Sequence, residues 1–352
     1  MIDLKQRIVA RIESDGPLPF DTYQAMCLYD PEEGFFSAAD DVRSSYGGDF
    51  VTSPEVTPHF GAAVGRFVAE ELGRTGSEGQ VVEVGAGSGS LAVAMRSEIA
   101  GVSLYAVESS AAARRQLRGV LGGDCVVASL AELPSAENRI TVANELVDNI
   151  PVALVVRADV GWVEQRVGWS GSEFGFVHEA PRPDVLEWVE RHARSVPSGA
   201  QVEVQLGARL WLAELVSSSV NGSALIIDYG GTTEELSTRR TTGTLRTYRG
   251  HHLGPHPFAE PGKTDITVDV DFSALADEGV SLGAEVELLR QDDFLTEFGL
   301  RDVVSSLRRA ELDLARSGDV MAQMRVRSER VDVETVLHPR GLGDFRVLIL
   351  RW

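Results

Sequence analysis

Short apolar runs alternate with segments of helical spacing through the middle of the chain. Val81, Val82 and Val84 form the first run, and residues 91–99 follow with apolar positions at helical intervals. Similar runs predict further strands near residues 103–107, 125–128, 140–144 and 223–228, with helices between them. This alternation is typical of an α/β fold with a parallel, Rossmann-like sheet.

The segments that precede and follow this core have different patterns. An amphipathic stretch at the start places Leu4, Ile8 and Ile12 on one helix face, as part of an N-terminal helical segment. Period-two alternation in VALVVRADVGWVEQRVGW and EFGFVHE predicts a small inserted β region. Helices are expected over about residues 58–73, 184–194 and 207–218.

The C-terminal third is expected to be partly irregular. Residues 231–270 are rich in Thr, Gly, His and Pro, which is typical of an irregular lid or wall. Helices are expected at 272–279 and 292–317, and VDVETVLHP and GDFRVLILRW then predict a terminal antiparallel hairpin that closes the sheet. The expected organisation is a cap at 1–78, a core formed by 79–150, 220–230 and 330–352, and substrate-side segments at 151–219 and 231–329.

Three alternate glycines follow the first strand in VVEVGAGSGS. Gly85, Gly87 and Gly89 let the backbone turn tightly and approach a ligand where a Cβ would collide, and the next helix directs free N–H groups at the bound molecule. A structural turn without a ligand is one alternative. Dinucleotide binding is another, but its pattern is G-x-G-x-x-G, and Ser90 stands where the third glycine belongs.

Two glutamates accompany the glycines. Glu83 lies two residues before Gly85 and can accept hydrogen bonds from a cationic amine. Glu108 ends the second strand in SLYAVESS, where a carboxylate can bind both hydroxyls of a ribose. S-adenosylmethionine carries a free amino acid and no phosphate, so this pair of acids favours that methyl donor over NAD.

Polar residues also follow the fourth and fifth predicted strands. TVANELVDNIP contains Asn144, Glu145 and Asp148, and ALIIDYGG contains Asp228 and Tyr229. Open α/β sheets bind ligands at the carboxyl ends of their strands. Glu145 can hold a guanidinium through paired hydrogen bonds and expose a nitrogen lone pair to a methyl group. Alternatively, Asn144 and Asp148 cap the following turn, and Asp228 begins another.

The segment GGDFVTSPEVT, before the first strand, can cover the cofactor. Its polar contacts would come from Asp49, Thr52 and Glu55, with Pro54 between the last two. The alternative is a simple helix entry in which Thr57 is the capping residue.

Histidines and cysteines give little indication of a metal site. His251 or His252 in YRGHHLGPH is a candidate base, although these residues also fit an ordinary loop. Cys27 and Cys125 lack metal-ligand spacing, so no metal site is expected and a reduced compartment fits.

The composition is that of an acidic globular protein. The chain has 352 residues, a formal net charge of -20 and 43% hydrophobic residues. This charge disfavours binding to nucleic acid or to an anionic membrane, and it is compatible with a basic partner protein or a cationic substrate. The start, MIDLKQRIVARIESDGP, lacks the apolar core of a signal peptide, and no apolar run has membrane-spanning length. A cytoplasmic protein is expected.

Nine blocks in order resemble the MidA family of S-adenosylmethionine-dependent methyltransferases, relatives of the mitochondrial complex I assembly arginine methyltransferase. They are GDFVTSPEVTPHFG, EVGAGSGSL, AVESSAAARRQL, NELVDNIPV, GWVEQRV, LIIDYG, GTLRTYRGHH, PGKTDITVDVDFSAL and LGDFRVL, and they run through most of the chain. The resemblance implies a class I methyltransferase fold with inserted segments and S-adenosylmethionine as cofactor. It places donor binding at Glu83, Gly85, Gly87, Gly89 and Glu108, and an acceptor site near Asn144, Glu145 and Asp148. The expected donor site also includes Ala86, Ser109, Ser129 and Leu130.

Two departures from the family pattern bear on the acceptor. The glycine loop of the family commonly reads G-P-G-R-G-T, whereas this chain has Ala86, Ser88 and Ser90 at the variable places. NEFFDALP becomes NELVDNIP, so Leu146 and Val147 replace two aromatic residues. Donor binding tolerates both changes, while the loss of aromatic walls reshapes the acceptor pocket.

The leading hypothesis is a methyltransferase that modifies an arginine, or another side-chain nitrogen, of a partner protein. A small-molecule N- or O-methyltransferase is a second reading, and a donor-binding assembly chaperone with little turnover is a third. A dinucleotide oxidoreductase comes last, because of the glycine spacing. A homodimer is compatible with all of them.

Overall fold

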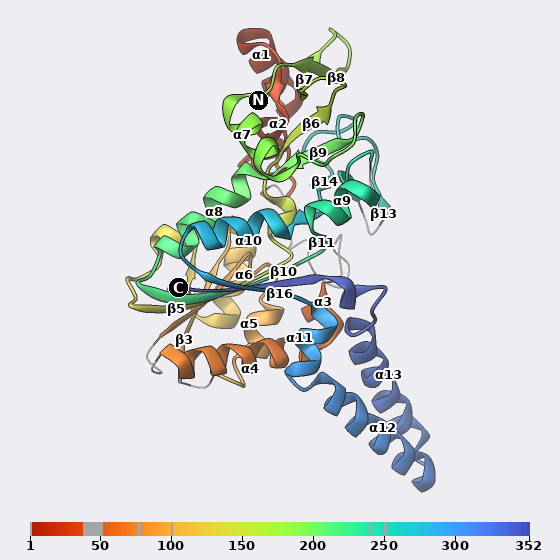
Figure 1. The fold of residues 1–352 in the computed structure, drawn as a ribbon. Helices are drawn as coiled ribbons and strands as arrows, with labels where there is room; N and C mark the ends of the chain where they lie inside the picture. The colour runs from red at the N-terminus through yellow and green to blue at the C-terminus, as the bar shows by residue number, and fades with distance from the viewer. Residues whose placement is uncertain (1, 38–51, 76–78, 100, 240, 250–251) are drawn as a thin grey trace. The chain divides into compact units, whose positions relative to one another are not determined.

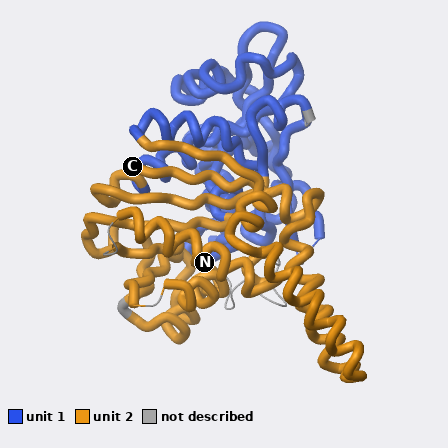
Figure 2. The backbone as a smooth tube through the Cα atoms, turned by 60° about the horizontal axis from the view of Figure 1, so that its bottom comes forward, with its two compact units in different colours: residues 1–43, 146–215, 230–283 blue, residues 44–145, 216–229, 284–352 orange. Residues whose placement is uncertain are grey.

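The protein forms two compact units in a computed structural model that describes residues 2–37, 52–75, 79–99, 101–239, 241–249 and 252–352. Unit 1 comprises residues 1–43, 146–215 and 230–283, and unit 2 comprises residues 44–145, 216–229 and 284–352 (Figure 2). Unit 2 therefore takes in residues 284–329, which the sequence-based division assigned to the substrate-side segments. Among the described residues, no helix combines the length and the apolar character needed to cross a membrane.

Unit 2 is built on a seven-stranded sheet with the order β16-β17-β10-β5-β2-β3-β4. The pairs from β10 through β5, β2 and β3 to β4 are parallel, and β17 is antiparallel to both of its neighbours. This arrangement confirms the expected α/β class with a mostly parallel, Rossmann-like sheet. The strands are β2 (Gln80–Val84), β3 (Ser103–Val107), β4 (Val126–Val127), β5 (Asn138–Asn144), β10 (Asn221–Asp228), β16 (Glu285–Arg290) and β17 (Arg346–Arg351).

Alternate residues of these strands form the core of unit 2. Val81, Ile140 and Leu225 come from three parallel strands and belong to one buried cluster. The same cluster takes in apolar residues of α4 (Pro58–Thr75) and α5 (Ser90–Met95), such as Phe67 and Met95. Figure 1 shows these two helices along one face of the sheet. The central strands are buried along nearly their whole length, so both faces of the sheet are covered, and α4 and α5 pack on one of them.

The strand order places two chain segments at a topological switch point. The chain runs outward from β2 through β3 to β4, and then β5 returns on the other side of β2. The connections that leave β2 and β5 therefore diverge at their carboxyl ends, which is where open α/β sheets bind ligands. Glu83 and Gly85 lie at the end of β2, and Asn144 and Glu145 lie at the end of β5.

The predicted terminal hairpin is wrong. Residues 331–336 belong to α13 (Val320–Val336), and β17 pairs with β10 and β16 instead of with its own upstream segment. A strand would bury Val331 and Val333 on one face, but Val331 is 46% exposed while Val333 and Val336 are buried. Burial at positions three apart is helical, and the period-two pattern of VDV was misleading.

The helix expected over residues 292–317 is two helices. α11 (Gln291–Glu297) and α12 (Leu300–Ser317) are separated at Gly299, whose φ is 84°. A left-handed residue ends helical propagation, and glycine adopts that conformation without a steric penalty. α12 and α13 then run side by side, and Figure 1 shows them extending away from the sheet of unit 2.

Unit 1 contains the inserted β region that the alternation predicted. β1 (Leu18–Pro19), β7, β6 and β9 pair in that order, and β8 pairs with β7. Trp162 and Val155 from this sheet pack with Val185 and Trp188 of α7 (Pro183–His192) in a second core. The remaining elements of this region are α1 (Leu4–Asp15), whose Leu4, Ile8 and Ile12 are buried as expected, α2 (Phe20–Tyr29), β6 (Ala153–Arg157), β7 (Trp162–Trp169), β8 (Phe174–Glu179) and β9 (Gln201–Val204).

Residues 231–270 have more regular structure than an irregular lid. Three strands pair in the order β13-β12-β14, and β11 pairs with β15. Buried threonine and aspartate side chains stabilise the turns between them; for example, Thr244 Oγ1 donates to Glu203 at 3.1 Å. The elements are β11 (Gly230–Gly231), α9 (Thr233–Arg239), β12 (Arg246–Arg249), β13 (His252–Leu253), β14 (Asp265–Thr267) and β15 (Val270–Asp271), and they lie between α8 (Leu206–Ser217) and α10 (Phe272–Ser281).

Candidate active site

The glycine turn after β2 has the backbone conformation that its sequence predicts. Gly85, Gly87 and Gly89 have φ values of 73°, 50° and 81°, all in the left-handed region. The Gly85 N–H donates to the Val107 carbonyl at 2.8 Å, which anchors the turn to the end of β3. A Cβ on Gly89 would also lie 2.7 Å from Leu117 Cδ2. Other residues would strain this turn, which then leads directly into α5.

Glu83 is a buried carboxyl group beside this turn. Its side chain is 4% exposed, and its Oε2 atom has no hydrogen-bond partner among the described residues. Burial, reinforced by the nearby Glu108 carboxylate and opposed by a hydrogen bond from the Ala92 backbone, raises the pKa of Glu83 to about 8. An unpaired buried carboxyl oxygen is well suited to an incoming ammonium group, which would restore the ionised form.

Glu108 is held at the end of β3 by backbone donors. Gly87 N–H donates to Oε2 at 3.0 Å, and Ser110 N–H donates to Oε1 at 2.7 Å. Arg114 donates to the carbonyls of Glu108 and Ser109, both at 2.7 Å. A carboxylate has about four acceptor positions, so each oxygen can still accept a hydroxyl proton. The geometry therefore fits recognition of a vicinal diol.

The other residues expected around the donor lie near the same edge of the sheet or on its neighbouring turns. Ala86 is 5% exposed within the glycine turn, and Ser109 is exposed after β3. Ser129 and Leu130 follow β4, where η2 (Leu130–Glu132) begins. These positions fit the prediction that they flank the donor, which stays a prediction.

The turn before α4 reaches the glycine loop. Thr52 and Glu55 form a capping box around α3 (Ser53–Val56), which also contains the buried Pro54. Glu55 Oε1 accepts a hydrogen bond from Ser88 Oγ at 3.3 Å, so α3 contacts the glycine loop, while the expected contact of this segment with the cofactor stays a prediction. The capping residue of this turn is Thr52, while Thr57 Oγ1 accepts from the His59 N–H at 3.4 Å. Asp49 lies outside the described residues.

Glu145 has the most unusual backbone in the described part of the chain. Its φ of 50° is the only positive value for a residue other than glycine among the described residues. Its N–H donates to the Ile227 carbonyl at 2.8 Å, and its Oε1 accepts from Asn144 Nδ2 at 3.2 Å and from Ser53 N at 3.4 Å. Such a conformation costs about 1–3 kcal/mol and persists where the surroundings enforce it. The turn therefore fixes this carboxylate at the carboxyl end of β5, next to the switch point between β2 and β5.

The remaining catalytic candidates are Asp228, Asp148 and the two histidines. Asp228 at the end of β10 is fully buried, and its Oδ1 accepts from the Tyr229 N–H at 2.9 Å. Asp148 belongs to unit 1, where its Oδ2 accepts from Thr267 Oγ1 at 2.7 Å. His251 lies outside the described residues, and His252 is exposed on β13. The described residues contain no group of three or more His, Cys, Asp or Glu side chains that could hold a metal ion.

Sequence reasoning missed two polar residues next to these groups. Ser53 is fully buried in α3, and Gln291 is fully buried at the start of α11. Ser53 lies within the segment GGDFVTSPEVT, so its polar neighbours Thr52 and Glu55 are the sequence signal that points to it. Nothing in the sequence around Gln291 indicated proximity to α3, which is 238 residues away.

Fold and site together define a class I methyltransferase that uses S-adenosylmethionine. The model of the Methyltransf_28 family, described as S-adenosyl-L-methionine-dependent methyltransferases, matches residues 63–288. The chain therefore belongs to this family, and the motif-based resemblance to MidA-type methyltransferases is confirmed. The alternative of a dinucleotide oxidoreductase is set aside.

Relatives and a solved structure agree with this assignment. A Drosophila melanogaster protein named protein arginine methyltransferase NDUFAF7 homolog, mitochondrial, is 28% identical and covers 76% of this chain and 68% of its own length. The Danio rerio NDUFAF7 protein is 26% identical over 96% of this chain and 88% of its own length. A COG1565 superfamily member from Burkholderia thailandensis, bound to S-adenosyl-homocysteine, is 28% identical with a TM-score of 0.84, covering 99% of this chain and 92% of that chain.

The residues present fit the methyl donor. Glu83 offers an unpaired buried carboxyl oxygen for the ammonium group, the three left-handed glycines open space for close backbone approach, and Glu108 has free acceptor positions for the ribose hydroxyls. When bound, S-adenosylmethionine supplies a methyl group on a sulfonium, which is transferred to a nucleophile.

Proposed function

We propose that this methyltransferase modifies an arginine side chain of a partner protein. The observation that carries the proposal is Glu145, whose carboxylate is fixed at the switch point by a left-handed backbone and by two donors from Asn144 and Ser53. A carboxylate binds a guanidinium through paired, charge-assisted hydrogen bonds, and relatives with 26–28% identity carry the name protein arginine methyltransferase.

The proposed step is an in-line displacement. A guanidinium nitrogen forms a bond to the methyl carbon while the carbon–sulfur bond breaks, and the sulfur leaves as a neutral thioether. The nitrogen then loses one proton to solvent water, either directly or through the Glu145 carboxylate. Glu145 would orient the guanidinium and withdraw positive charge from the reacting nitrogen, which raises the share of productive encounters.

The test compares Glu145→Gln with a matched change at an exposed glutamate, Glu70→Gln. Purified protein is incubated with lysate and methyl-labelled S-adenosylmethionine, and label is mapped to residues by mass spectrometry. We expect label on arginine with the wild type and with Glu70→Gln, and about 10²-fold slower transfer with Glu145→Gln at near-normal donor affinity. Unchanged transfer by Glu145→Gln would remove Glu145 from the site. Label only in the small-molecule fraction would instead identify a small-molecule methyltransferase.

We also propose that the partner protein is basic and that the enzyme works in the cytoplasm. The net charge of -20 favours a partner of opposite charge. Cys27 and Cys125 are both free, in keeping with a reduced compartment, although the named relatives are mitochondrial proteins. Fractionation of the native cells tests the compartment.

We propose further that two copies associate through α12 and α13. Residues 300–336 carry seven arginines and seven acidic residues, so this segment is neutral in a chain of net charge -20. Two copies can therefore meet there without net repulsion. Leu312, Met321 and Met324 are 55%, 66% and 62% exposed. Light scattering should report a dimer that the double change Met321→Glu and Met324→Glu dissociates, while Val160→Glu does not. A monomeric wild type at high concentration would refute this proposal.

A further inference from the structure

The short helix α3 connects the two halves of the candidate site in unit 2. Glu55 contacts Ser88 of the glycine loop at 3.3 Å, and the Ser53 N–H contacts Glu145 Oε1 at 3.4 Å. α3 has only four residues, and its amides at Glu55 and Val56 both donate to the Thr52 carbonyl. A single helical turn is not stable by itself, so tertiary contacts must fix its position.

Gln291 supplies one of these contacts from a distant part of the chain. Its Nε2 atom donates to Ser53 Oγ and to the Val336 carbonyl, both at 3.4 Å, and its backbone N–H donates to the Phe345 carbonyl at 2.9 Å. The side chain is fully buried. Gln291 thus links α3 to the end of α13 and to the residue before β17.

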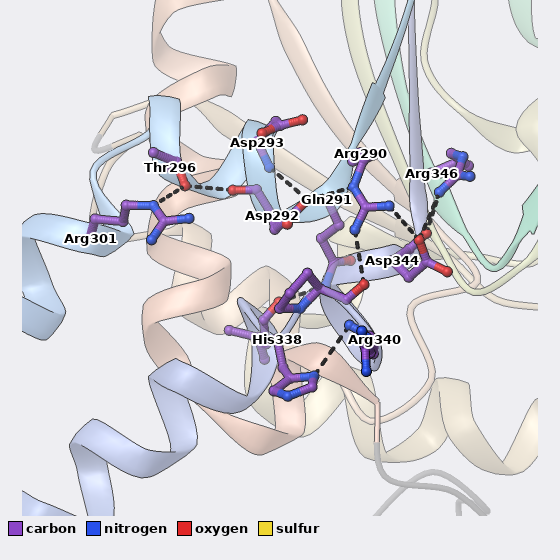
Figure 3. A network of polar contacts seen from close by, with 12 residues as sticks. Arg290, Gln291, Asp292, Asp293, Thr296, Arg301, His338, Arg340, Asp344 and Arg346 are labelled. Carbon is purple, nitrogen blue, oxygen red and sulfur yellow. Dashed lines mark hydrogen bonds and ion pairs between the residues drawn. The ribbon is translucent and has the colours of Figure 1, made fainter.

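The residues next to Gln291 in sequence restrain its backbone. Figure 3 shows Gln291 between Arg290 and Asp292, and Arg290 pairs with both Asp292 and Asp344. These ion pairs connect the start of α11 to η4 (Leu342–Asp344). The amide of Gln291 is therefore presented to Ser53 from a well-anchored backbone.

Glutamine is not the residue that would give the highest stability at position 291. Its Oε1 atom is buried and has no hydrogen-bond partner among the described residues. A buried unpaired amide oxygen is unfavourable, and a methionine of similar length would fill the same space without it. The contribution of the glutamine at this position is therefore the pair of hydrogen bonds that its Nε2 atom donates, one of which reaches Ser53.

We propose that Gln291 is a positioning residue that holds α3, through Ser53, where the backbone N–H of Ser53 meets Glu145. The inference rests on the proposed role of Glu145 as the carboxylate that orients the acceptor. In this role Gln291 touches neither donor nor acceptor. Its loss would free α3 and loosen the Glu145 carboxylate, while Glu83, the glycine turn and Glu108 keep their own contacts.

The test compares Gln291→Met with Gln205→Met, a second buried glutamine. Gln205 donates to the Asp269 carbonyl at 3.0 Å and accepts from Asp271 N at 3.1 Å, so both of its amide atoms are paired within unit 1. We expect Gln291→Met to change the melting temperature little, because the loss of its two long hydrogen bonds, to Ser53 Oγ and to the Val336 carbonyl, is offset by removal of the unpaired Oε1 atom. We expect Gln205→Met to lower the melting temperature, because it leaves two buried groups without partners.

Hydrogen exchange measured on the peptide that covers residues 52–57 reports the position of α3 without any acceptor. We expect about tenfold faster exchange in this peptide for Gln291→Met and for Ser53→Ala, with no further increase in the double variant, and no change for Gln205→Met. Affinity for S-adenosylhomocysteine should change less than threefold. Methyl transfer to the protein labelled by the wild type should fall about tenfold in kcat, with KM for the donor unchanged.

The outcomes separate the inference from the proposed function. Unchanged exchange at residues 52–57 in Gln291→Met overturns the inference, as does faster exchange over the whole of unit 2 together with a lower melting temperature, which would mean a structural role only. Faster exchange without a fall in kcat also overturns it. If the wild type labels no protein, the proposed function fails, and the exchange measurement still decides whether Gln291 holds α3.

Discussion

Replacing Glu83 by glutamine should stabilise the donor-free protein in a pH-dependent way. The pKa of Glu83 is raised from its ordinary value of 4.5 to about 8, chiefly by burial. In the unfolded chain the carboxyl ionises at its ordinary value, whereas in the folded protein it keeps its proton until pH 8. Between these values the folded state binds more protons, so stability falls as pH rises. Glutamine has the same shape, stays neutral and avoids this loss.

The size of the effect follows from the two pKa values. At pH 7 the ionised form is favoured in the unfolded chain, which costs the folded wild type about 3 kcal/mol relative to a neutral side chain, rising to about 5 kcal/mol at pH 9. Below pH 4.5 the difference disappears. Glu83→Gln should therefore match the wild type near pH 4 and exceed its free energy of unfolding by up to about 3 kcal/mol at pH 7.

Donor binding should favour glutamate at position 83, whereas stability of the donor-free protein favours glutamine. Ionised Glu83 would bind the ammonium of the donor through a charge-assisted hydrogen bond, so Glu83→Gln should bind S-adenosylhomocysteine about 10- to 100-fold more weakly. At pH 7 about nine-tenths of the free wild type holds the proton, and binding should release it. Calorimetry in two buffers of different ionisation enthalpy counts that proton.

Urea unfolding of wild type, Glu83→Gln and the exposed control Glu70→Gln from pH 4 to pH 9 measures the stability difference. A parallel pH dependence of wild type and Glu83→Gln would refute the reasoning, because it would mean that Glu83 titrates alike in both states. Absence of proton release on donor binding at pH 7 would refute the assignment of the ammonium to this carboxyl. Glu70→Gln should follow the wild type in both measurements.

Two further predictions concern unit 2, one for the packing of two helices and one for a buried ion pair. A Cβ on Gly61 would lie 2.4 Å from Ala94 Cβ, where α4 meets α5, whereas a Cβ on the exposed Gly73 of the same helix meets nothing within 4 Å. Gly61→Ala should lower the free energy of unfolding by about 2 kcal/mol, and Gly73→Ala should raise it by about 0.5–1 kcal/mol. Urea denaturation measures both changes. Equal effects of the two substitutions would contradict the close packing of α4 on α5. Arg351 Nε donates to the buried Glu71 at 2.9 Å, so Arg351→Met should cost about 2 kcal/mol, while Arg316→Met at an exposed pair should cost under about 0.5 kcal/mol. Similar losses in thermal melts of these two variants would mean that burial of Glu71 is unimportant.

The sequence by itself determined the parts of the protein that depend on local chemistry. β-branched runs predicted the parallel strands of unit 2, and the glycines at positions 85, 87 and 89 predicted a turn whose φ values only glycine adopts easily. Glu83 lies one residue before the end of β2 and Glu108 directly follows β3, and these positions beside the turn are the basis for the prediction that both bind the donor. These signals lie within a few residues of the feature they specify.

Only the tertiary structure decided features that depend on contacts between distant residues. β17 pairs with β16, about 60 residues upstream, through an antiparallel ladder of backbone hydrogen bonds, and the intervening helices leave no local trace of that pairing. The left-handed backbone of Glu145 is imposed by contacts with Ile227 and Ser53, not by its own preference. The hydrogen bond from Gln291 to Ser53 likewise depends on tertiary contacts between distant segments. Burial and long-range hydrogen bonding create these arrangements, and neither is encoded in the spacing of neighbouring residues.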